Sequence, residues 1–318
     1  MSSPSIIRRH SENPIVTRDT FPIPLEGAYN SGCIKLPGGR YVMAARCNKL
    51  DQRTLIWLLD SEDGVHFTPR PKPMPLPAEP WWEFYASDVA YDPRMTVMEE
   101  GGEILMTMAC HGAVGCRIAI FRSEDETQSW RFLGYMGPPD HRNTVFFPRK
   151  FDGLYTVLDR PNMPAAGAEN GGGMGGIWIR QSPDLKFWSA VDRIIGPERF
   201  RNYGVHGIGP GPPPLLTDRG WLCIIHCVMP AARTLVYSVG AIVLDRDDPT
   251  RVIGQTREAI MVPDALYEMV GLVPGVCFPC GAVLEESGEV KIYYGGADRV
   301  TALGISSVDQ LLGACGVS

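Results

Sequence analysis

The stretch IWLLDSEDGVHF, residues 56–67, decides the fold, because four later segments repeat its design of a short apolar strand followed by a polar turn. These segments are IAIFRSEDETQSW (118–130), IWIRQSPDLKFW (177–188), AIVLDRDDPTRVI (241–253) and ALGISSVDQLL (302–312). When Ser61, Ser123, Ser182, Asp245 and Ser306 are taken as equivalent points, the steps are 62, 59, 63 and 61 residues. A regular step of this size is typical of the blades of a β-propeller.

A second strand with the same period follows a Gly turn in each unit. Its five copies are GGRYVMAARC (38–47), GGEILMTMACH (101–111), DGLYTVLDRP (152–161), RGWLCIIHCV (219–228) and SGEVKIYYGGAD (287–298). Five copies of a turn with two or more strands leave little room for helices or for a second domain. The sequence therefore predicts an all-β chain that forms a single five-bladed β-propeller domain over residues 1–318.

The composition agrees with many short strands joined by tight turns, since the 318 residues include 35 Gly and 28 Pro. A formal charge of −6 provides no basic surface for nucleic acid or anionic lipid, so neither is an expected partner. The chain has no run of about eighteen apolar residues and no signal peptide at its start, which predicts a cytoplasmic protein without a membrane span. Small molecules are the expected partners, and a homo-oligomer stays open.

The nine cysteines have no disulfide spacing and are expected to be free, mostly buried thiols. Cys277 and Cys280 form one CxxC pair, but no second pair or His lies at a zinc-ligand spacing. No metal site is predicted.

The second strands end in polar residues, which are Arg46, His111, Arg160, His226 and Asp298. Equivalent positions of successive blades surround one axis, so these five side chains could converge on a single pocket. The alternative is that strands end in polar residues where they meet solvent.

Other polar residues stand in the apolar first strands, among them Asn30 in GAYNSGCIKL (27–36) and Asp92 with Arg94 in AYDPRMTV (90–97). Asp92 is either a salt-bridged turn residue or a general acid in a pocket. Trp81 and Trp82 could offer a face for sugar stacking. The other tryptophans at strand positions are expected in the core, and they are Trp57, Trp178, Trp188 and Trp221.

A group of possible oxyanion donors comes from adjacent predicted blades: Arg142, Asn143, Arg160, His226 and Tyr237. The planar fork of Arg suits two phosphate oxygens, and the other side chains can each add a hydrogen bond. This group predicts an anion site on an acidic protein. The alternative is that these residues balance carboxylates such as Asp159 or satisfy buried backbone groups.

The chain resembles glycoside hydrolase family 130, the β-mannoside phosphorylases and related β-mannosidases, through motifs that follow one another over nearly its whole length. They are NPIV (13–16), GAYNSGCIK (27–35), YDPRMT (91–96), RNTVFFPRKFDGLYTVLDRP (142–161), NGGGMGG (170–176), GPGPPPLLTDRGWLCIIH (209–226) and VCFPCGAVLEESGEVKIYYGGAD (276–298). The resemblance implies a five-bladed propeller that needs no cofactor and uses inorganic phosphate as co-substrate. It implies inverting phosphorolysis of β-1,4-mannosyl-glucose or β-mannooligosaccharides, with release of α-mannose 1-phosphate.

The resemblance also implies roles for individual residues. Asp92 would be the proton donor, and its proton would reach the glycosidic oxygen through a hydroxyl of the mannose. Phosphate would be held by Arg142, Asn143, Arg160, His226 and Tyr237. Mannose would be held by Asn30, Ser31, Arg46, Arg94 and Asp298. An inverting displacement by phosphate needs an acid and a set of fixed donors but no second carboxylate base.

One departure from the family pattern keeps other activities open. Many phosphorylases of the family have a Lys where this chain has Gly207, and His206 or Arg201 could supply the missing charge. An inverting β-mannosidase is one alternative, with Glu268 as the candidate base. A non-catalytic sugar-binding propeller is the other.

Overall fold

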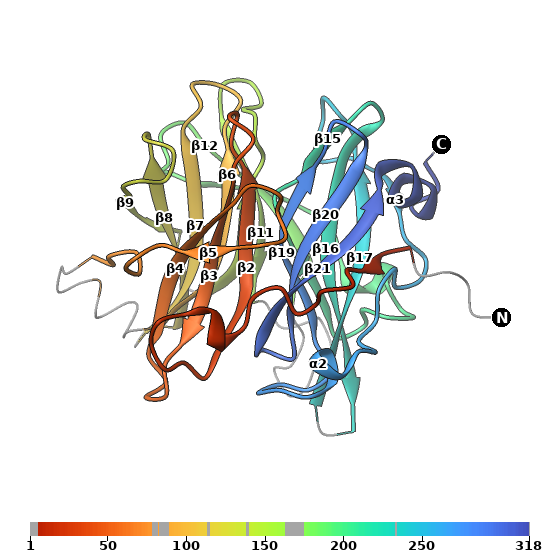
Figure 1. The fold of residues 1–318 in the computed structure, drawn as a ribbon. Coiled ribbons are helices and arrows are strands. Elements are labelled where there is room, and N and C mark those ends of the chain that lie inside the picture. The colour runs from red at the N-terminus through yellow and green to blue at the C-terminus, as the bar shows by residue number, and fades with distance from the viewer. Residues whose placement is uncertain are drawn as a thin grey trace.

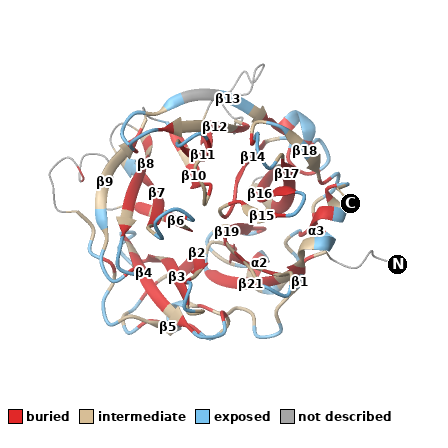
Figure 2. Cartoon of the chain, turned by 90° about the horizontal axis from the view of Figure 1, so that it is seen from above, coloured by how far each residue is buried: buried red, intermediate tan, exposed pale blue. Residues whose placement is uncertain are grey.

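The computed structural model describes residues 6–77, 82, 89–112, 115–137, 140–162, 175–232 and 234–317. Over these residues the chain forms five small antiparallel sheets around one axis, as Figure 1 shows from the side and Figure 2 from above. The protein is a five-bladed β-propeller, which confirms the predicted fold class. The prediction that residues 1–318 form a single domain stays a prediction.

Each blade runs from an innermost strand at the axis to an outermost strand at the rim (Figure 2). The first blade contains β2 (Gly27–Lys35), β3 (Tyr41–Asn48), β4 (Thr54–Ser61) and β5 (Thr68–Pro69). The second contains β6 (Ala90–Val97), β7 (Ile104–Gly112), β8 (Gly115–Ser123) and β9 (Arg131–Met136). The third contains β10 (His141–Phe146), β11 (Tyr155–Pro161), β12 (Ile177–Ser182) and β13 (Ser189–Ile195).

The last two blades have the same plan with local additions. The fourth contains β14 (Gly207–Pro210) and β15 (Leu215–Thr217), both paired with β16 (Gly220–Ala231), and then β17 (Thr234–Leu244) and β18 (Val252–Gln255). The fifth contains β19 (Cys277–Leu284), β20 (Glu289–Gly296), β21 (Val300–Ser307) and the N-terminal strand β1 (Arg8–Arg9). The short helices are η1 (Arg18–Thr20), η2 (Pro197–Arg199), α2 (Leu266–Met269) and α3 (Val308–Ala314). None of these helices has the length and apolar character that crossing a bilayer requires, within the part of the chain that the structure describes.

The two ends of the chain close the ring. β1 pairs with β21, with Arg8 opposite Ile305 and Arg9 opposite Gly304, so that the first strand completes the last blade (Figure 1). The hydroxyl of Ser306 adds a hydrogen bond of 2.8 Å to the carbonyl oxygen of Ile6. This pairing covers an edge of β21 that would otherwise be open to association.

Five hydrophobic clusters lie between neighbouring blades. Between the first two, for example, Ile34 and Ile56 pack with Met95 and Phe121. Both faces of a blade are covered in this way, so its strands are apolar on both sides, as the near-continuous apolar runs of the sequence require. Trp57 and Trp221 are buried in two of these clusters, as predicted.

Trp82 does not form a sugar-stacking face. Its side chain is only 4% exposed, and its ring packs within 6 Å of the rings of Phe121, Phe132 and Tyr135. The prediction was wrong because the large apolar ring of Trp82 joins the hydrophobic cluster between the first two blades. Trp81 lies outside the described residues.

The repeated Ser or Asp of the sequence caps the turn after the third strand. The hydroxyl of Ser61 accepts from the backbone N–H of Gly64, that of Ser182 from Leu185, and a carboxylate oxygen of Asp245 from Asp248. In the fifth unit this bond is made by Ser307, whose hydroxyl accepts from the N–H of Gln310 at the start of α3. Ser307, and not Ser306, is therefore the residue of the fifth unit that corresponds to Ser61. Ser306 instead donates to the segment that closes the ring.

Candidate active site

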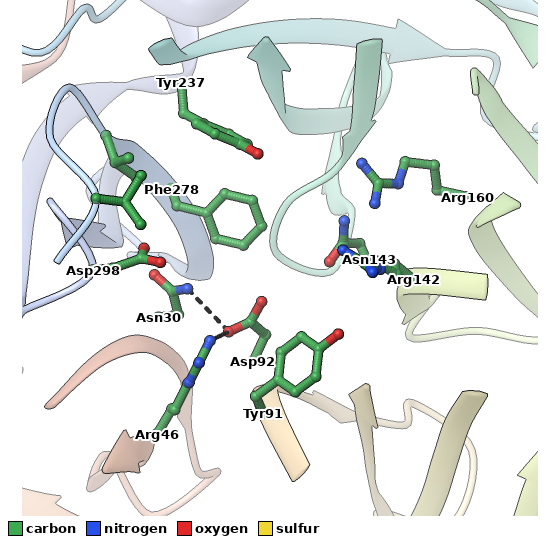
Figure 3. Close-up of a pocket in the computed structure, with 12 residues that line it drawn as sticks. Asn30, Arg46, Tyr91, Asp92, Arg142, Asn143, Arg160, Tyr237, Phe278 and Asp298 are labelled. Atoms are coloured by element: carbon green, nitrogen blue, oxygen red, sulfur yellow. Dashed lines mark hydrogen bonds and ion pairs between the residues drawn. The ribbon is translucent and has the colours of Figure 1, made fainter. Parts of the chain in front are cut away.

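A cavity of about 190 Å³ lies on the axis of the propeller, and all five blades contribute to it (Figure 3). It is lined by Asn30, Arg46, Tyr91, Asp92, Arg142, Asn143, Arg160, Tyr237, Val273, Val276, Phe278 and Asp298. Eight of the eleven predicted site residues are in this set. Segments that are far apart in the sequence therefore meet in one pocket, as the repeat predicted.

The innermost strands of three blades bring polar side chains to this cavity through the same backbone irregularity. Asn30, Asp92 and Asn143 have φ values of 50°, 55° and 59°, in the left-handed region. At each of them the pairing with the next strand shifts register, which marks a β-bulge. Asn and Asp tolerate this conformation better than other residues with a side chain, and a bulge redirects a side chain out of the pleat.

Asp92 lies deep in the cavity and is held by two donors. Its side chain is 8% exposed, and one carboxylate oxygen accepts from Asn30 Nδ2 at 3.0 Å and from Arg46 Nη1 at 3.1 Å. The guanidinium of Arg46 lies 4.6 Å from the ring centre of Tyr29 and 4.9 Å from that of Tyr91. These aromatic rings hold the Arg46 side chain in position beside the carboxylate.

Asp298 is the second carboxyl group of the cavity. Burial raises the pKa of Asp298 to about 6, with a further increase from the charge of Asp92 and an opposing effect of Arg46. Its neighbour Asn30 needs Gly295 beside it, since a Cβ atom on Gly295 would lie 1.9 Å from Asn30 Oδ1. The carboxyl groups of Asp92 and Asp298 both lie near the guanidinium of Arg46, in a site with little access to water.

Positive charge collects on the other side of the same cavity. Figure 3 shows Arg142, Asn143 and Arg160 on one side, and Asn30, Arg46 and Asp298 on the other, with Asp92 between them. Burial and the nearby charges of Arg142 and Arg94 lower the pKa of Arg160 to about 10. Among the described residues, Arg142 forms no ion pair, and its Nε atom is buried without a hydrogen-bond partner. An anion bound here would relieve the repulsion between the guanidiniums.

Three predicted site residues lie behind the wall of the cavity instead of lining it. The hydroxyl of Ser31 is 2.7 Å from that of Thr301. Arg94 donates to the carbonyl oxygens of Gly211 at 2.8 Å and Asp92 at 3.2 Å, which supports the bulge that carries Asp92.

His226 is the third, and it is fully buried with its ring centre 4.6 Å from that of Phe278. Burial and the charges of Arg160 and Arg94 lower the pKa of His226 well below its usual range, so the ring is neutral. Neither ring nitrogen has a partner among the described residues. A Cβ atom on Gly209 would lie 2.5 Å from His226 Cε1, so Gly is needed at this position to make room for the ring.

Three further candidates do not line the cavity. His111, one of the five polar strand ends, is exposed, which agrees with the alternative that such ends meet solvent. His206 and Arg201, considered as substitutes for the missing Lys at Gly207, do not line the cavity either.

Glu268 is a structural residue and not a free base. Its side chain is fully buried, and it pairs with Arg9 through two bonds of 2.8 and 2.7 Å. It also accepts from the hydroxyl of Tyr294 and from the backbone N–H groups of Asp264 and Ala265. These donors leave no place for a water molecule that the carboxylate could activate.

Sequence reasoning missed the aromatic and apolar part of the cavity, which consists of Tyr91, Val273, Val276 and Phe278. Tyr91 directly precedes Asp92, and strand alternation would have put it on the opposite face, but the bulge between Tyr91 and Arg94 interrupts that alternation. The others could not be separated from core residues by pattern alone. Within the described residues, no group of three His, Cys, Asp or Glu side chains could hold a metal ion, and all nine cysteines are free and buried.

Comparison with known proteins places these features in a family. The model of glycoside hydrolase family 130, described as β-1,4-mannooligosaccharide phosphorylase, matches residues 7–316. The chain is 29% identical to the β-1,4-mannooligosaccharide phosphorylase of Ruminococcus albus over 315 residues, which cover 96% of this chain and 90% of that protein. It is 27% identical to the 4-O-β-D-mannosyl-D-glucose phosphorylase of Bacteroides fragilis, with 92% and 76% of the two chains covered.

A solved structure is similar over its full length. The β-1,2-mannobiose phosphorylase of Listeria innocua, in complex with β-1,2-mannobiose, superposes with a TM-score of 0.84 and 25% identity, covering 98% of this chain and 99% of that one. The names of these relatives give different mannosidic linkages and acceptors.

Proposed function

The chain belongs to glycoside hydrolase family 130, and from this membership and the geometry of the cavity we propose that it catalyses inverting phosphorolysis of β-mannosides. The observation that carries the proposal is the juxtaposition of a carboxyl group, Asp92, with the guanidinium groups of Arg142 and Arg160 in one cavity. A hydrolase needs a carboxylate that activates water, whereas a phosphorylase needs fixed donors for an anionic nucleophile. The side of the cavity formed by Arg142, Asn143 and Arg160 offers donors and no carboxylate among the described residues.

In the proposed reaction, an oxygen of inorganic phosphate attacks C1 of the mannosyl unit as the bond from C1 to the glycosidic oxygen breaks. Asp92 supplies the proton that the departing oxygen takes up, by way of a mannose hydroxyl. The products are α-mannose 1-phosphate and the shortened saccharide. Inversion follows because the nucleophile enters on the face opposite the departing oxygen.

We propose that the mannosyl unit lies against Asn30, Arg46 and Asp298, and that phosphate binds to Arg142, Asn143, Arg160 and Tyr237. His226 lies next to Arg160 behind this group, and its neutral ring has one N–H that could donate to phosphate if the ring reaches the cavity. Ser31 and Arg94 would act through the bulges that they support. A β-1,4 linkage is the first choice, to glucose or to mannose, because the similarity to the Ruminococcus albus enzyme extends over most of both chains.

The test is a panel of β-1,4-mannobiose, β-1,4-mannosyl-glucose and β-1,2-mannobiose, each incubated with and without phosphate. Phosphate-dependent release of mannose 1-phosphate is expected for at least one of them. Release of mannose at an equal rate without phosphate would establish a hydrolase instead. Sugar binding by calorimetry with no turnover in either condition would establish a binding protein.

A further inference from the structure

A buried carboxylate, Asp159, lies behind the cationic side of the cavity and is not one of its lining residues. Its side chain is fully buried, and it accepts from Thr144 Oγ1 at 2.7 Å and Arg180 Nε at 2.7 Å, with His141 Nδ1 at 2.8 Å. Hydrogen bonds from these groups lower the pKa of Asp159 against the opposing effect of burial. The group is therefore an anion that three side chains of its own blade stabilise.

Every member of this network except Arg180 is a direct neighbour, in sequence, of a residue that lines the cavity. His141 precedes Arg142, Thr144 follows Asn143, and Asp159 precedes Arg160. On β11 the alternation of the strand puts Asp159 and Arg160 on opposite faces. On β10 the bulge at Asn143 interrupts the alternation, so Arg142 and Asn143 both line the cavity while His141 and Thr144 both reach Asp159. The bond from Thr144 to Asp159 ties the bulge of β10 at Asn143 to the neighbouring strand β11.

This tie opposes a local repulsion. Arg142 and Arg160 are directly opposite each other in the pairing of β10 with β11, and like charges in such a pair destabilise it. Burial is the main cause of the lowered pKa of Arg160, and the charge of Arg142 lowers it further. The bond from Thr144 to Asp159 adds a side-chain contact to the backbone pairing of the two strands, next to these charges.

We propose that Asp159 is a positioning residue that holds Arg142, Asn143 and Arg160 in the arrangement that binds phosphate. The proposal rests on the proposed function, since it assigns this network to the phosphate side of that site. Asp159 acts through the two strands and does not contact phosphate. Its loss should weaken phosphate binding while leaving the mannose side of the cavity intact.

The test compares three variants with the wild-type protein, by steady-state kinetics and by calorimetric titration with inorganic phosphate. Asp159→Asn should raise the KM and the Kd for phosphate about ten-fold, the effect of weakening a buried charged hydrogen-bond network, with a change of less than about two-fold in the KM for the mannoside. Thr144→Val removes one hydrogen-bond donor to Asp159 without a change in charge. It should raise the KM for phosphate, but by less than Asp159→Asn does. Thr144→Ser keeps the hydroxyl and should restore wild-type phosphate binding.

Asp60→Asn is the control, because Asp60 is likewise a carboxylate held by cationic side chains, Arg40 and Arg70, but lies on β4 away from the cavity. This variant can lose stability but should keep the wild-type KM for phosphate. If folded Asp159→Asn binds phosphate as the wild type does, the positioning role is excluded. If Asp159→Asn does not fold, an unchanged KM for phosphate in Thr144→Val excludes the positioning role. A wild-type protein that neither binds nor requires phosphate overturns the proposed function itself, and the titration separates that result from the others.

Discussion

Single residues decide the electrostatics of this cavity, and the most informative is Asp92. Its carboxylate is held between Asn30 and Arg46, and the bulge in which it lies is supported from behind by Arg94. The sequence left two readings of Asp92, a salt-bridged turn residue or an acid in a pocket. The geometry combines them, since Asp92 is paired with Arg46 and lines the cavity.

Asp92→Asn should lower kcat for phosphorolysis by about 10²- to 10⁴-fold, the usual contribution of a positioned general acid. The change preserves the size of the side chain, and Asn accepts the left-handed backbone that Asp92 has. Thermal unfolding should therefore be little changed, and the measurement is phosphate-dependent release of mannose 1-phosphate. Wild-type kcat in a folded variant would contradict the assignment.

Asp298 should make the stability of the protein depend on pH in a predictable window. Its pKa is raised from 3.8 to about 6, so the folded state holds a proton that the unfolded state has lost, and stability falls as pH rises from about 4 to about 6. Two pKa units correspond to on the order of 3 kcal/mol. Asp298→Asn should therefore raise the melting temperature at pH 8 relative to wild type and show no gain at pH 4. An equal effect at both pH values would contradict the raised pKa.

At the scale of the element, the innermost strands owe their arrangement to close approaches that only glycine permits. A Cβ atom on Gly32 of β2 would lie 2.5 Å from the carbonyl oxygen of Pro93, next to the bulge of Asp92 on β6. A Cβ atom on Gly281 of β19 would lie 2.5 Å from the backbone nitrogen of Cys33. Strand pairing could be predicted from the repeat, but these contacts between blades and the bulges could not, because they depend on how five sheets meet.

Gly32→Ala should destabilise the protein by about 1–3 kcal/mol, the usual cost of overpacking, because the opposing atom belongs to the backbone and cannot rotate away. The displacement should also reach Asp92 and reduce kcat. Gly38→Ala is the control, since a Cβ atom there meets no atom within 4 Å. Urea unfolding and kcat of both variants provide the measurement, and equal stability of the two would refute the packing argument.

At the scale of the whole molecule, the ring closure and the wall of the cavity are connected. Arg9 of the closing strand β1 pairs with Glu268 of α2, and the carbonyl oxygen of Glu268 accepts from the N–H groups of Gly275 and Val276. Val276 lines the cavity. The N-terminal strand therefore stabilises both the last blade and one wall of the site.

Arg9→Met should lower the free energy of unfolding by about 3–5 kcal/mol, since it leaves the buried carboxylate of Glu268 without its cation. Arg8→Met, in the same strand but exposed, should change it by less than about 0.5 kcal/mol. Chemical denaturation of the two variants provides the comparison. A similar loss in both would mean that β1 contributes through its backbone pairing alone.

The sequence by itself determined the number of blades, the strands of each repeat and most of the residues that meet at the axis, because period and alternation are local properties of a chain. The tertiary structure decided which polar residues line the cavity, such as Arg160, and which lie behind it, such as His226, or face away from it, as His111 does. It also decided that Glu268 is saturated by Arg9, a residue 259 positions away. Such partners come together only when the ring closes, and no local pattern in the sequence encodes that distance.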